Sequence, residues 1–197
     1  MNTLLARRGF LSAAFGLLVL PRLAAAKELA GIVLPDTARP GGGDADVRLL
    51  GGGVFRFLFL RYYVCGLYAA ETLSDAAAIL AKDAPRRVQL VALRRITSFE
   101  FLWGLDKGLA DNMSESESKE LHAPLERVRA TIRSIGAIKP GTRVSIDYVP
   151  RAGTSILVDE RASGVPIAGK PLNDALMQVW VGERPLDASL KKALLGG

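Results

Sequence analysis

The sequence predicts an α+β protein, an antiparallel β-sheet with helices packed mainly on one of its faces. Strand-like and helix-like patterns are segregated along the chain, in the order strands, helices, a hairpin and helices again. Residues 142–149 alternate between apolar and polar side chains, and a turn at 150–153 leads into a further strand pattern at 154–158. Segregation of this kind is typical of an antiparallel sheet backed by helices.

The first 26 residues have the composition of an export signal. Arg7 and Arg8 precede an apolar run of about ten residues, which is too short to span a bilayer. Alanines at 24–26 offer a small-residue cleavage site. The arginine pair followed by x-F-L is similar to a twin-arginine (Tat) signal, and an ordinary Sec signal is the alternative. We therefore expect residues 1–26 to be cleaved off after Ala26. The mature chain is then expected to be a periplasmic protein of a bacterium and to have no stable membrane anchor.

The remaining residues, 27–197, have the length of one domain. They hold 23 basic and 20 acidic residues, a net charge of +3, and no basic stripe with interleaved aromatics, so nucleic acid is not an expected partner. Cys65 is the only cysteine and His122 the only histidine, which excludes an internal disulfide and a His/Cys metal cluster. No nucleotide-binding or nucleophile motif occurs, and we expect no metal and no cofactor.

The densest apolar and aromatic stretch of this domain is residues 51–68. Its three opening glycines are interpreted as a turn. Residues 54–65 are rich in Phe, Tyr, Val and Leu and predict one long central strand, bent or bulged, with both faces covered. Strict alternation places Arg56 and Tyr63 on opposite faces, so only a bulge or bend would bring both into one cleft. Arg56 and Arg61 each need water, a carboxylate or a ligand, because an unpaired guanidinium in an apolar layer is costly.

Local capping signals define the central helices. Thr97 and Glu100 form an S/T-x-x-E capping box that opens a helix, and Ser114 with Glu117 forms a second one. The second helix meets Pro124, which should break or restart it. Further strands are expected at 27–34, 46–50, 87–93 and 165–167, and further helices over 75–82 with Ser74 as N-cap, from Pro171 to Gly182, and after the N-cap Asp187.

Three segments together resemble the chalcone isomerase-like family of bacteria. They are the G-x-x-R, aromatic and G-L-Y pattern of residues 53–68, the D-Y-V-P and G-T pattern of 147–154, and the W-V-G and P-L-D-A-S-L-K pattern of 180–191. The resemblance extends from about residue 30 to the end of the sequence. It implies an open-faced sandwich, in which an antiparallel sheet is backed by helices and a ligand cleft lies between them.

The resemblance also implies candidate site residues, which depart from the plant enzymes of this family. Their cleft holds an arginine of the central strand, a threonine before a G-x-Y motif, and a tyrosine and an asparagine on the next helix. Arg56 matches the arginine with the spacing about one residue off, and Tyr63 stands at the threonine position. The helix over 97–112 has phenylalanines and no tyrosine, and Asn112 lies too far along it to match the asparagine of the plant enzymes. These departures argue against chalcone cyclisation, whereas the fold inference is unaffected.

The first functional hypothesis is that the protein is exported and binds a small amphipathic acid, fatty-acid-like or phenolic, without catalysis. The resemblance supports it, because non-catalytic relatives of this family bind fatty acids. Arg56 would hold the acid group in a cleft between sheet and helices. The alternatives are an intramolecular lyase of the chalcone isomerase type and an envelope protein–protein interaction module. A salt bridge to Glu71 or Asp147 is the purely structural role for Arg56. No catalytic residue is assigned, and the candidate ligand-binding residues are Arg56, Tyr62, Tyr63, Phe101 and Tyr148.

Overall fold

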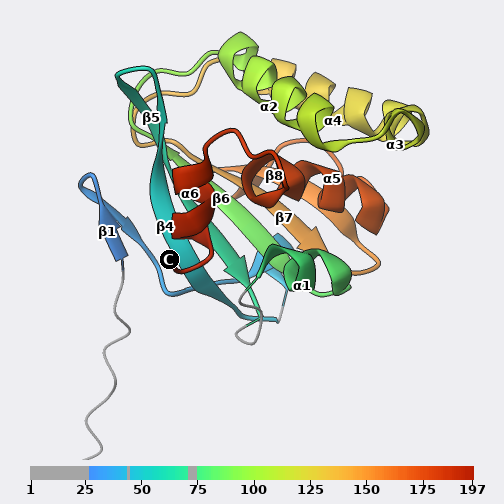
Figure 1. Cartoon of the computed structure of the whole chain (residues 1–197), viewed down its shortest axis with the longest axis horizontal. Helices are drawn as coiled ribbons and strands as arrows, with labels where there is room; N and C mark the ends of the chain where they lie inside the picture. Colours follow the sequence, from blue (N-terminus) through green and yellow to red (C-terminus); the bar gives the residue numbers. More distant parts are fainter. Residues whose placement is uncertain (1–26, 44, 71–74) are drawn as a thin grey trace, which may run out of the picture.

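The computed structural model describes residues 27–43, 45–70 and 75–197, which form a seven-stranded antiparallel sheet with helices on one face (Figure 1). The predicted fold class is confirmed. Strand order in the sheet follows the sequence, β3-β4-β5-β6-β7-β8-β9, so each strand pairs with the strands that precede and follow it. The strands are β3 (Thr37–Ala38), β4 (Val47–Phe57), β5 (Leu60–Ala69), β6 (Arg86–Ala92), β7 (Arg143–Val149), β8 (Gly153–Val158) and β9 (Arg161–Ala162).

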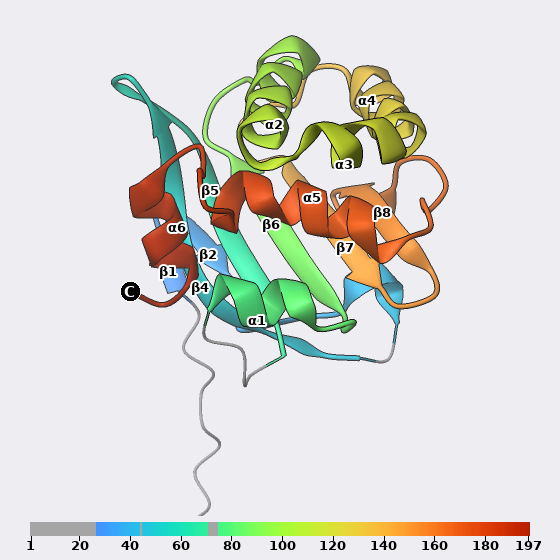
Figure 2. The ribbon, with the colours of Figure 1, turned by 45° about the vertical axis from the view of Figure 1, so that its right-hand side comes forward.

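The helices lie side by side over one face of the sheet. Helix α5 runs across the sheet, with α2, α3 and α4 along one side of it and α1 along the other (Figure 2). The main hydrophobic core lies between the sheet and these helices, and α5 is buried along most of its length. The helices are α1 (Ala76–Ala81), α2 (Ser98–Asn112), α3 (Glu115–Glu120), α4 (His122–Ile135), α5 (Lys170–Val181) and α6 (Ala188–Leu194), with one 3-10 turn, η1 (Pro40–Gly42).

A small hairpin covers part of the opposite face of the sheet. It consists of β1 (Lys27–Leu29) and β2 (Ile32–Leu34), which form a separate two-stranded sheet. Leu34 of this hairpin is fully buried against Val64 and Val91 of the main sheet. The expected single strand over 27–34 is therefore wrong, because the chain reverses at two residues with positive φ, Ala30 and Gly31.

The central stretch is a hairpin rather than one long strand. β4 and β5 pair with each other, and Phe57 lies opposite Leu60, so the chain reverses at Leu58 and Phe59. The sequence interpretation failed because this turn contains no Gly, Asn, Asp or Pro, the residues that mark most tight turns. Instead Leu58 adopts a φ of 55°, a conformation that branched L-residues rarely take.

A bulge next to the turn changes which side chains share a face. Phe55 pairs with Tyr63 and Arg56 with Arg61, so Tyr62 is the extra residue on β5. The distortion expected in this stretch is thus present, within a hairpin.

The glycine triplet lies inside β4 and is not a turn. A Cβ atom on Gly51 would stand 2.2 Å from the carbonyl oxygen of Ala193, and one on Gly53 would stand 2.9 Å from Leu190 Cδ1. A Cβ on Gly52, which faces the other way, would meet Leu34 Cδ1 at 2.6 Å. Helix α6 therefore packs directly on the backbone of β4, and only glycine leaves room for this approach.

The capping boxes of the sequence are confirmed. Thr97 and Glu100 cap α2 reciprocally, and Ser114 and Glu117 cap α3 in the same way. The helix after Ser114 breaks at Leu121 and restarts as α4, as expected from the nearby proline. Asp187 caps α6 by accepting the backbone N–H groups of Ser189 and Leu190.

Two further details differ from expectation. Helix α1 is capped by Asp75, whose carboxylate accepts the N–H of Ala78, whereas the expected cap Ser74 lies outside the described residues. The predicted strand at 165–167 is a single bridge from Ile167 to β8, and the edge of the sheet is the two-residue strand β9.

The expected export signal, residues 1–26, lies outside the described residues. In the part of the chain that is described, no helix has the length and apolar character needed to cross a membrane. The described residues also contain no group of three or more His, Cys, Asp or Glu side chains that could hold a metal ion.

The packing of α6 on β4 leads to a stability prediction. Gly51→Ala should lower the free energy of unfolding by about 2 kcal/mol, because its methyl group would overlap the backbone of α6. The measurement is the midpoint of urea unfolding. Gly43→Ala is the matched control, since its Cβ would be 3.5 Å from the nearest atom, an ordinary contact. Equal midpoints for the two variants would contradict this description of the packing.

Candidate functional site

The candidate site is a cavity of about 270 Å³ between the β4–β5 hairpin, α2 and α5. We call it the aromatic pocket, because eight of the residues that line it are Phe, Tyr or Trp. Apolar cavities with a few polar groups are the usual form of small-molecule sites. The lining residues are Phe55, Phe57, Tyr62, Tyr63, Ile96, Phe99, Glu100, Phe101, Trp103, Gly104, Leu105, Val179, Trp180 and Leu186.

The hairpin supplies one wall of the aromatic pocket. Because of the bulge, consecutive residues Tyr62 and Tyr63 both line it. The ring of Phe55 stacks on that of Tyr63, with centroids 4.9 Å apart and planes 18° apart, and meets Tyr62 edge-on. Three aromatic rings therefore hold one another in place without a ligand.

Tyr63 forms the inner end of this wall. Its hydroxyl accepts a hydrogen bond from Trp180 Nε1 at 3.2 Å, which ties the hairpin to α5. Burial raises the pKa of Tyr63 well above its usual value, Cys65 nearby raises it further, and the Trp180 hydrogen bond only partly opposes this. The phenol is therefore protonated at neutral pH. Since it already accepts from the indole, its own proton is available for a ligand oxygen.

Helix α2 forms the mouth of the aromatic pocket. Phe99 and Trp103 line the pocket and are also exposed, as is Phe57 on the hairpin. The Phe57 and Trp103 rings meet edge-on with centroids 5.3 Å apart, so hairpin and helix touch across the entrance. The entrance is apolar from both sides.

Two charged groups lie near the aromatic pocket. Glu100 lines it, and its carboxylate accepts hydrogen bonds of 2.8 Å from both the backbone N–H and the hydroxyl of Thr97. These bonds, from the backbone first and the side chain second, lower the pKa of Glu100, so it stays ionised as part of the helix cap. The guanidinium of Arg94 lies over the ring of Tyr62, 4.7 Å from its centroid. Its Nη1 is buried and has no hydrogen-bond partner.

Comparison with known proteins assigns the chain to a family. The chalcone isomerase-like family matches residues 26–196. The chain belongs to the chalcone isomerase-like family. Among solved structures, a fatty-acid binding protein of Arabidopsis thaliana is similar, with a TM-score of 0.63 over 87% of this chain and 95% of that chain. The two share 18% of their residues, so this likeness establishes the fold alone. No curated protein is significantly similar to the chain in sequence.

In this chalcone isomerase-like chain, Arg56 lies outside the aromatic pocket. Phe55 and Phe57 line the pocket, so the side chain of Arg56 between them points to the other face of the hairpin and is exposed. Its backbone N–H donates to the carboxylate of Asp187. The alternative salt bridge to Asp147 is also wrong, because that carboxylate is taken by Arg87. Glu71 lies outside the described residues.

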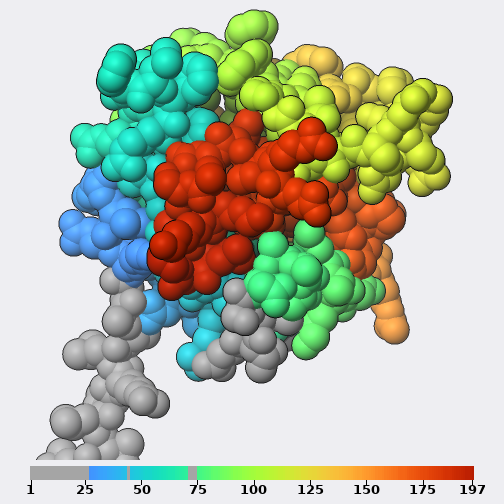
Figure 3. Space-filling model, viewed as in Figure 1, coloured from blue at the N-terminus to red at the C-terminus, as the bar shows by residue number. Residues whose placement is uncertain are grey.

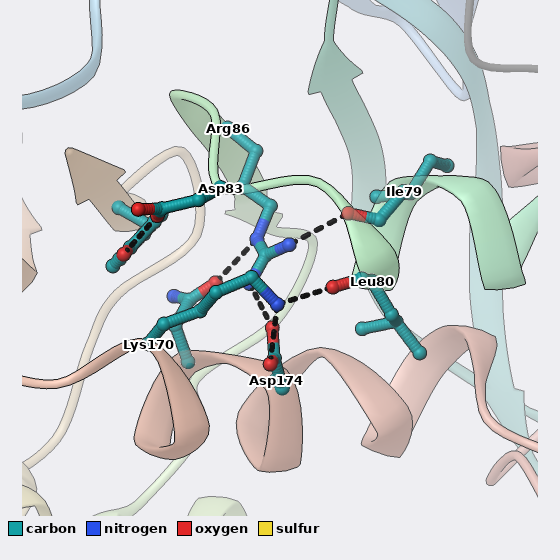
Figure 4. A network of polar contacts seen from close by, with 8 residues as sticks. Ile79, Leu80, Asp83, Arg86, Lys170 and Asp174 are labelled. Carbon is teal, nitrogen blue, oxygen red and sulfur yellow. Dashed lines mark hydrogen bonds and ion pairs between the residues drawn. The ribbon is translucent and has the colours of Figure 1, made fainter. Parts of the chain in front are cut away.

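Tyr148 lies in a separate polar network, not in the aromatic pocket. Its hydroxyl donates to Asp83 at 2.6 Å, and burial and this bond raise its pKa to about 12. Above its ring, 5.1 Å from the centroid, lies the guanidinium of the buried Arg86. Arg86 is also bonded to Asp174 and to the carbonyl of Ile79, and Lys170 reaches the same carboxylate (Figure 4). The network joins the sheet to α1 and α5 and has a structural role.

The remaining predicted residues do line the aromatic pocket. Tyr62, Tyr63 and Phe101 come together there, from β5 and α2. Phe101 and Ile96 also line a second, smaller cavity of about 30 Å³, whose other walls include Val144 and Ile146. The apolar side chains of β7 thus line this second cavity rather than the aromatic pocket.

The C-terminal motif of the family builds the inner wall and its support. Trp180 and Leu186 line the aromatic pocket. Gly182 has no room for a Cβ, which would stand 2.4 Å from Asn112 Oδ1. Asn112 donates to the carbonyl of Arg184 and accepts its N–H, so this asparagine holds the loop after α5 rather than a ligand. The motif is therefore explained by packing and loop geometry.

Sequence reasoning missed the residue that places positive charge near the aromatic pocket, Arg94. It stands between β6 and the Thr97 capping box, a position at which the end of a strand meets the start of a helix. The only sequence signal was a pair of arginines, Arg94 and Arg95, directly before that box. Its contact with Tyr62 depends on a residue some 30 positions earlier and is not visible in the local sequence.

The hydrogen bond between Trp180 and Tyr63 leads to a second prediction. Tyr63→Phe should lower the free energy of unfolding by about 1–2 kcal/mol, because it leaves the buried indole N–H without an acceptor. Tyr68→Phe is the matched control, since the Tyr68 hydroxyl is buried without any partner and its removal should be neutral or stabilising. Thermal unfolding of both variants measures the difference. A Tyr68→Phe loss as large as that of Tyr63→Phe would refute the assignment.

Proposed function

We propose that the protein binds a small amphipathic acid, fatty-acid-like or phenolic, in the aromatic pocket and does not transform it. The observation that carries this proposal is the lining itself, which is apolar and aromatic apart from the tyrosines, the indole N–H and Glu100. The solved structure of similar fold is a fatty-acid binding protein, which supports the same ligand class. The second cavity behind Phe101 offers room for a longer chain.

The acid group would be held by Arg94 in this proposal. Its buried, unpartnered Nη1 is a costly group to leave unsatisfied, and a carboxylate or phenolate would offset that cost. The guanidinium already lies over Tyr62, which lines the aromatic pocket, so little rearrangement is needed for it to meet a ligand there. The hydroxyl of Tyr63 would supply a second donor at the inner end.

The isomerase alternative receives less support from the geometry. Cyclisation of a chalcone needs a cation and hydroxyl donors aimed at the oxygen on which charge develops. Helix α2 contributes phenylalanines and a tryptophan to the lining and no hydroxyl donor. No arginine, lysine or histidine is among the described residues of that lining, so catalysis, like acid binding, would depend on Arg94 beside it. We expect naringenin chalcone to disappear no faster with the protein than in buffer. A faster disappearance that requires Arg94 would replace the binding proposal with an enzymatic one.

We further propose that the protein acts in the periplasm after cleavage following Ala26. The arginine pair, the short apolar run and the alanines of residues 1–26 support this. The test is the intact mass of the protein from a periplasmic fraction, which should correspond to a chain starting at Lys27. Replacing Arg7 and Arg8 by lysine should block export by the Tat route, whereas unchanged export would point to Sec.

The role of Arg94 is tested with laurate and its methyl ester, which differ in the charge of the head group. Arg94→Gln should weaken laurate binding about tenfold or more and leave methyl laurate unchanged, because only the anion gains from the guanidinium. Titration calorimetry measures both. Arg95→Gln, an exposed neighbour, and Arg56→Gln are the matched controls and should bind like the wild type. Loss of laurate binding in Arg56→Gln alone would show that Arg56, not Arg94, binds the acid group.

The position of the ligand is tested by filling the aromatic pocket. Gly104 lies on α2 and lines the pocket, and a Cβ there would be 3.7 Å from the nearest atom, so a side chain can be accommodated. Gly104→Leu should abolish binding of both laurate and its ester while the melting temperature is kept or raised, since leucine favours a helix more than glycine does. Gly104→Ala is the smaller control. Unchanged binding in Gly104→Leu would exclude this pocket.

A further inference from the structure

The turn of the β4–β5 hairpin exposes large apolar side chains. Phe59 is fully exposed, at 101%, and Leu58 is 78% exposed, while Phe57 and Leu60 on either side are about half exposed. Turn positions are usually polar. Figure 1 shows this hairpin extending beyond the rest of the sheet beside α2. We call residues 57–60 the hairpin tip.

Two arginines flank the hairpin tip in a way that folding stability does not explain. Arg56 and Arg61 lie directly opposite each other on β4 and β5, and both are exposed. Like charges in this position destabilise a sheet. Among the described residues, no carboxylate forms an ion pair with either guanidinium. An anionic group placed between them would offset their repulsion, so the pair has the charge pattern of a binding site for an anion.

The apolar surface continues from the hairpin tip onto α2. Phe99 and Trp103 are 78% and 48% exposed, and Trp103 contacts Phe57. In the space-filling view the hairpin and the start of α2 form one edge of the molecule (Figure 3). Exposed Trp and Phe side chains with arginines beside them are typical of segments that lie at a membrane interface.

We propose that the hairpin tip docks on the surface of a lipid bilayer that contains anionic phospholipids. Leu58 and Phe59 would enter the acyl region, and Arg56 and Arg61 would bind lipid phosphates. Phe57 would then lie at the bilayer surface with the mouth of the aromatic pocket. An amphipathic acid could pass between bilayer and pocket without crossing water. Docking requires no ligand in the pocket, so the docking proposal can be tested independently of the proposed function.

A second copy of the chain fits this surface less well than a bilayer. A stable dimer interface buries about 800 Å² on each partner, whereas the hairpin tip is a four-residue turn in which Phe59 alone is fully exposed. Self-association through the tip would also bring further guanidinium groups toward the Arg56–Arg61 pair and increase the repulsion. A bilayer accepts two apolar side chains at one point and supplies phosphates around them.

The experiment is vesicle flotation of the mature chain, residues 27–197, with phosphatidylcholine vesicles that contain or lack phosphatidylglycerol. The wild type should float with the anionic vesicles and much less with the neutral ones. Arg56→Gln with Arg61→Gln should weaken the anionic binding about fivefold for each charge removed. Leu58→Gly with Phe59→Ser should weaken it more than about tenfold. Glycine also relieves the positive φ at Leu58, so this variant should remain folded.

Matched controls remove the same groups elsewhere. Arg151→Gln with Arg161→Gln removes two exposed charges, and Val165→Ser removes an exposed apolar side chain, and both should float like the wild type. A wild type that does not float with anionic vesicles, or tip variants that float as well as the controls, would overturn the proposal. So would size-exclusion chromatography showing a dimer that the Leu58→Gly, Phe59→Ser variant dissociates, because the tip would then be a self-association surface. Laurate binding is measured in the same tip variants, so that a loss of membrane docking can be distinguished from a loss of ligand binding.

Discussion

The direct packing of α6 on the backbone of β4 is the constraint on which the site depends. It requires Gly51 and Gly53 at the contact, because any Cβ there would overlap α6. The N-cap of α6, Asp187, accepts its own helix N–H groups and also the N–H of Arg56, so helix and hairpin are joined at one carboxylate. Burial raises the pKa of Asp187, but the hydrogen bond from the Ser189 hydroxyl and those from the backbone N–H groups together lower it. The residue before it, Leu186, thereby lines the aromatic pocket.

The protein separates its buried charges from its apolar site. Arg86 and Arg87 are adjacent on β6, point to opposite faces, and are both buried against carboxylates, Asp174 and Asp147 respectively. Burying an ion pair is favourable only when the remaining polar atoms are also bonded, and Asp147 meets this condition through the N–H of Gly41. These networks hold α5 and η1 to the sheet. The aromatic pocket, which lies away from them, retains an apolar lining.

The aromatic pocket and the hairpin tip share side chains, and this links the two proposals physically. Phe57 belongs to both, and its contact with Trp103 closes one side of the pocket entrance. The rest of the hairpin tip, Leu58, Phe59 and Leu60, is exposed. Movement of the tip would therefore change the entrance, and a surface that holds the tip would act on the same side chains that a ligand passes.

Local chemistry made much of the fold predictable. The capping boxes at Thr97 and Ser114 involve residues three positions apart, and the β7–β8 hairpin follows from alternation and an adjacent turn. The aromatic residues of the site could also be predicted, since Tyr62, Tyr63 and Phe101 line the aromatic pocket.

Only the tertiary structure decided where the charges lie and how the central stretch is folded. The turn at Leu58 has no turn residue, so strand propensity alone predicts one continuous strand there. The role of the glycines depends on a helix more than a hundred residues away. Arg56 points away from the pocket because of the pairing of β4, and Arg94 is placed by the ring of Tyr62. Strand pairing and packing between distant segments cannot be predicted from local sequence patterns, because the residues that come into contact lie far apart in the sequence.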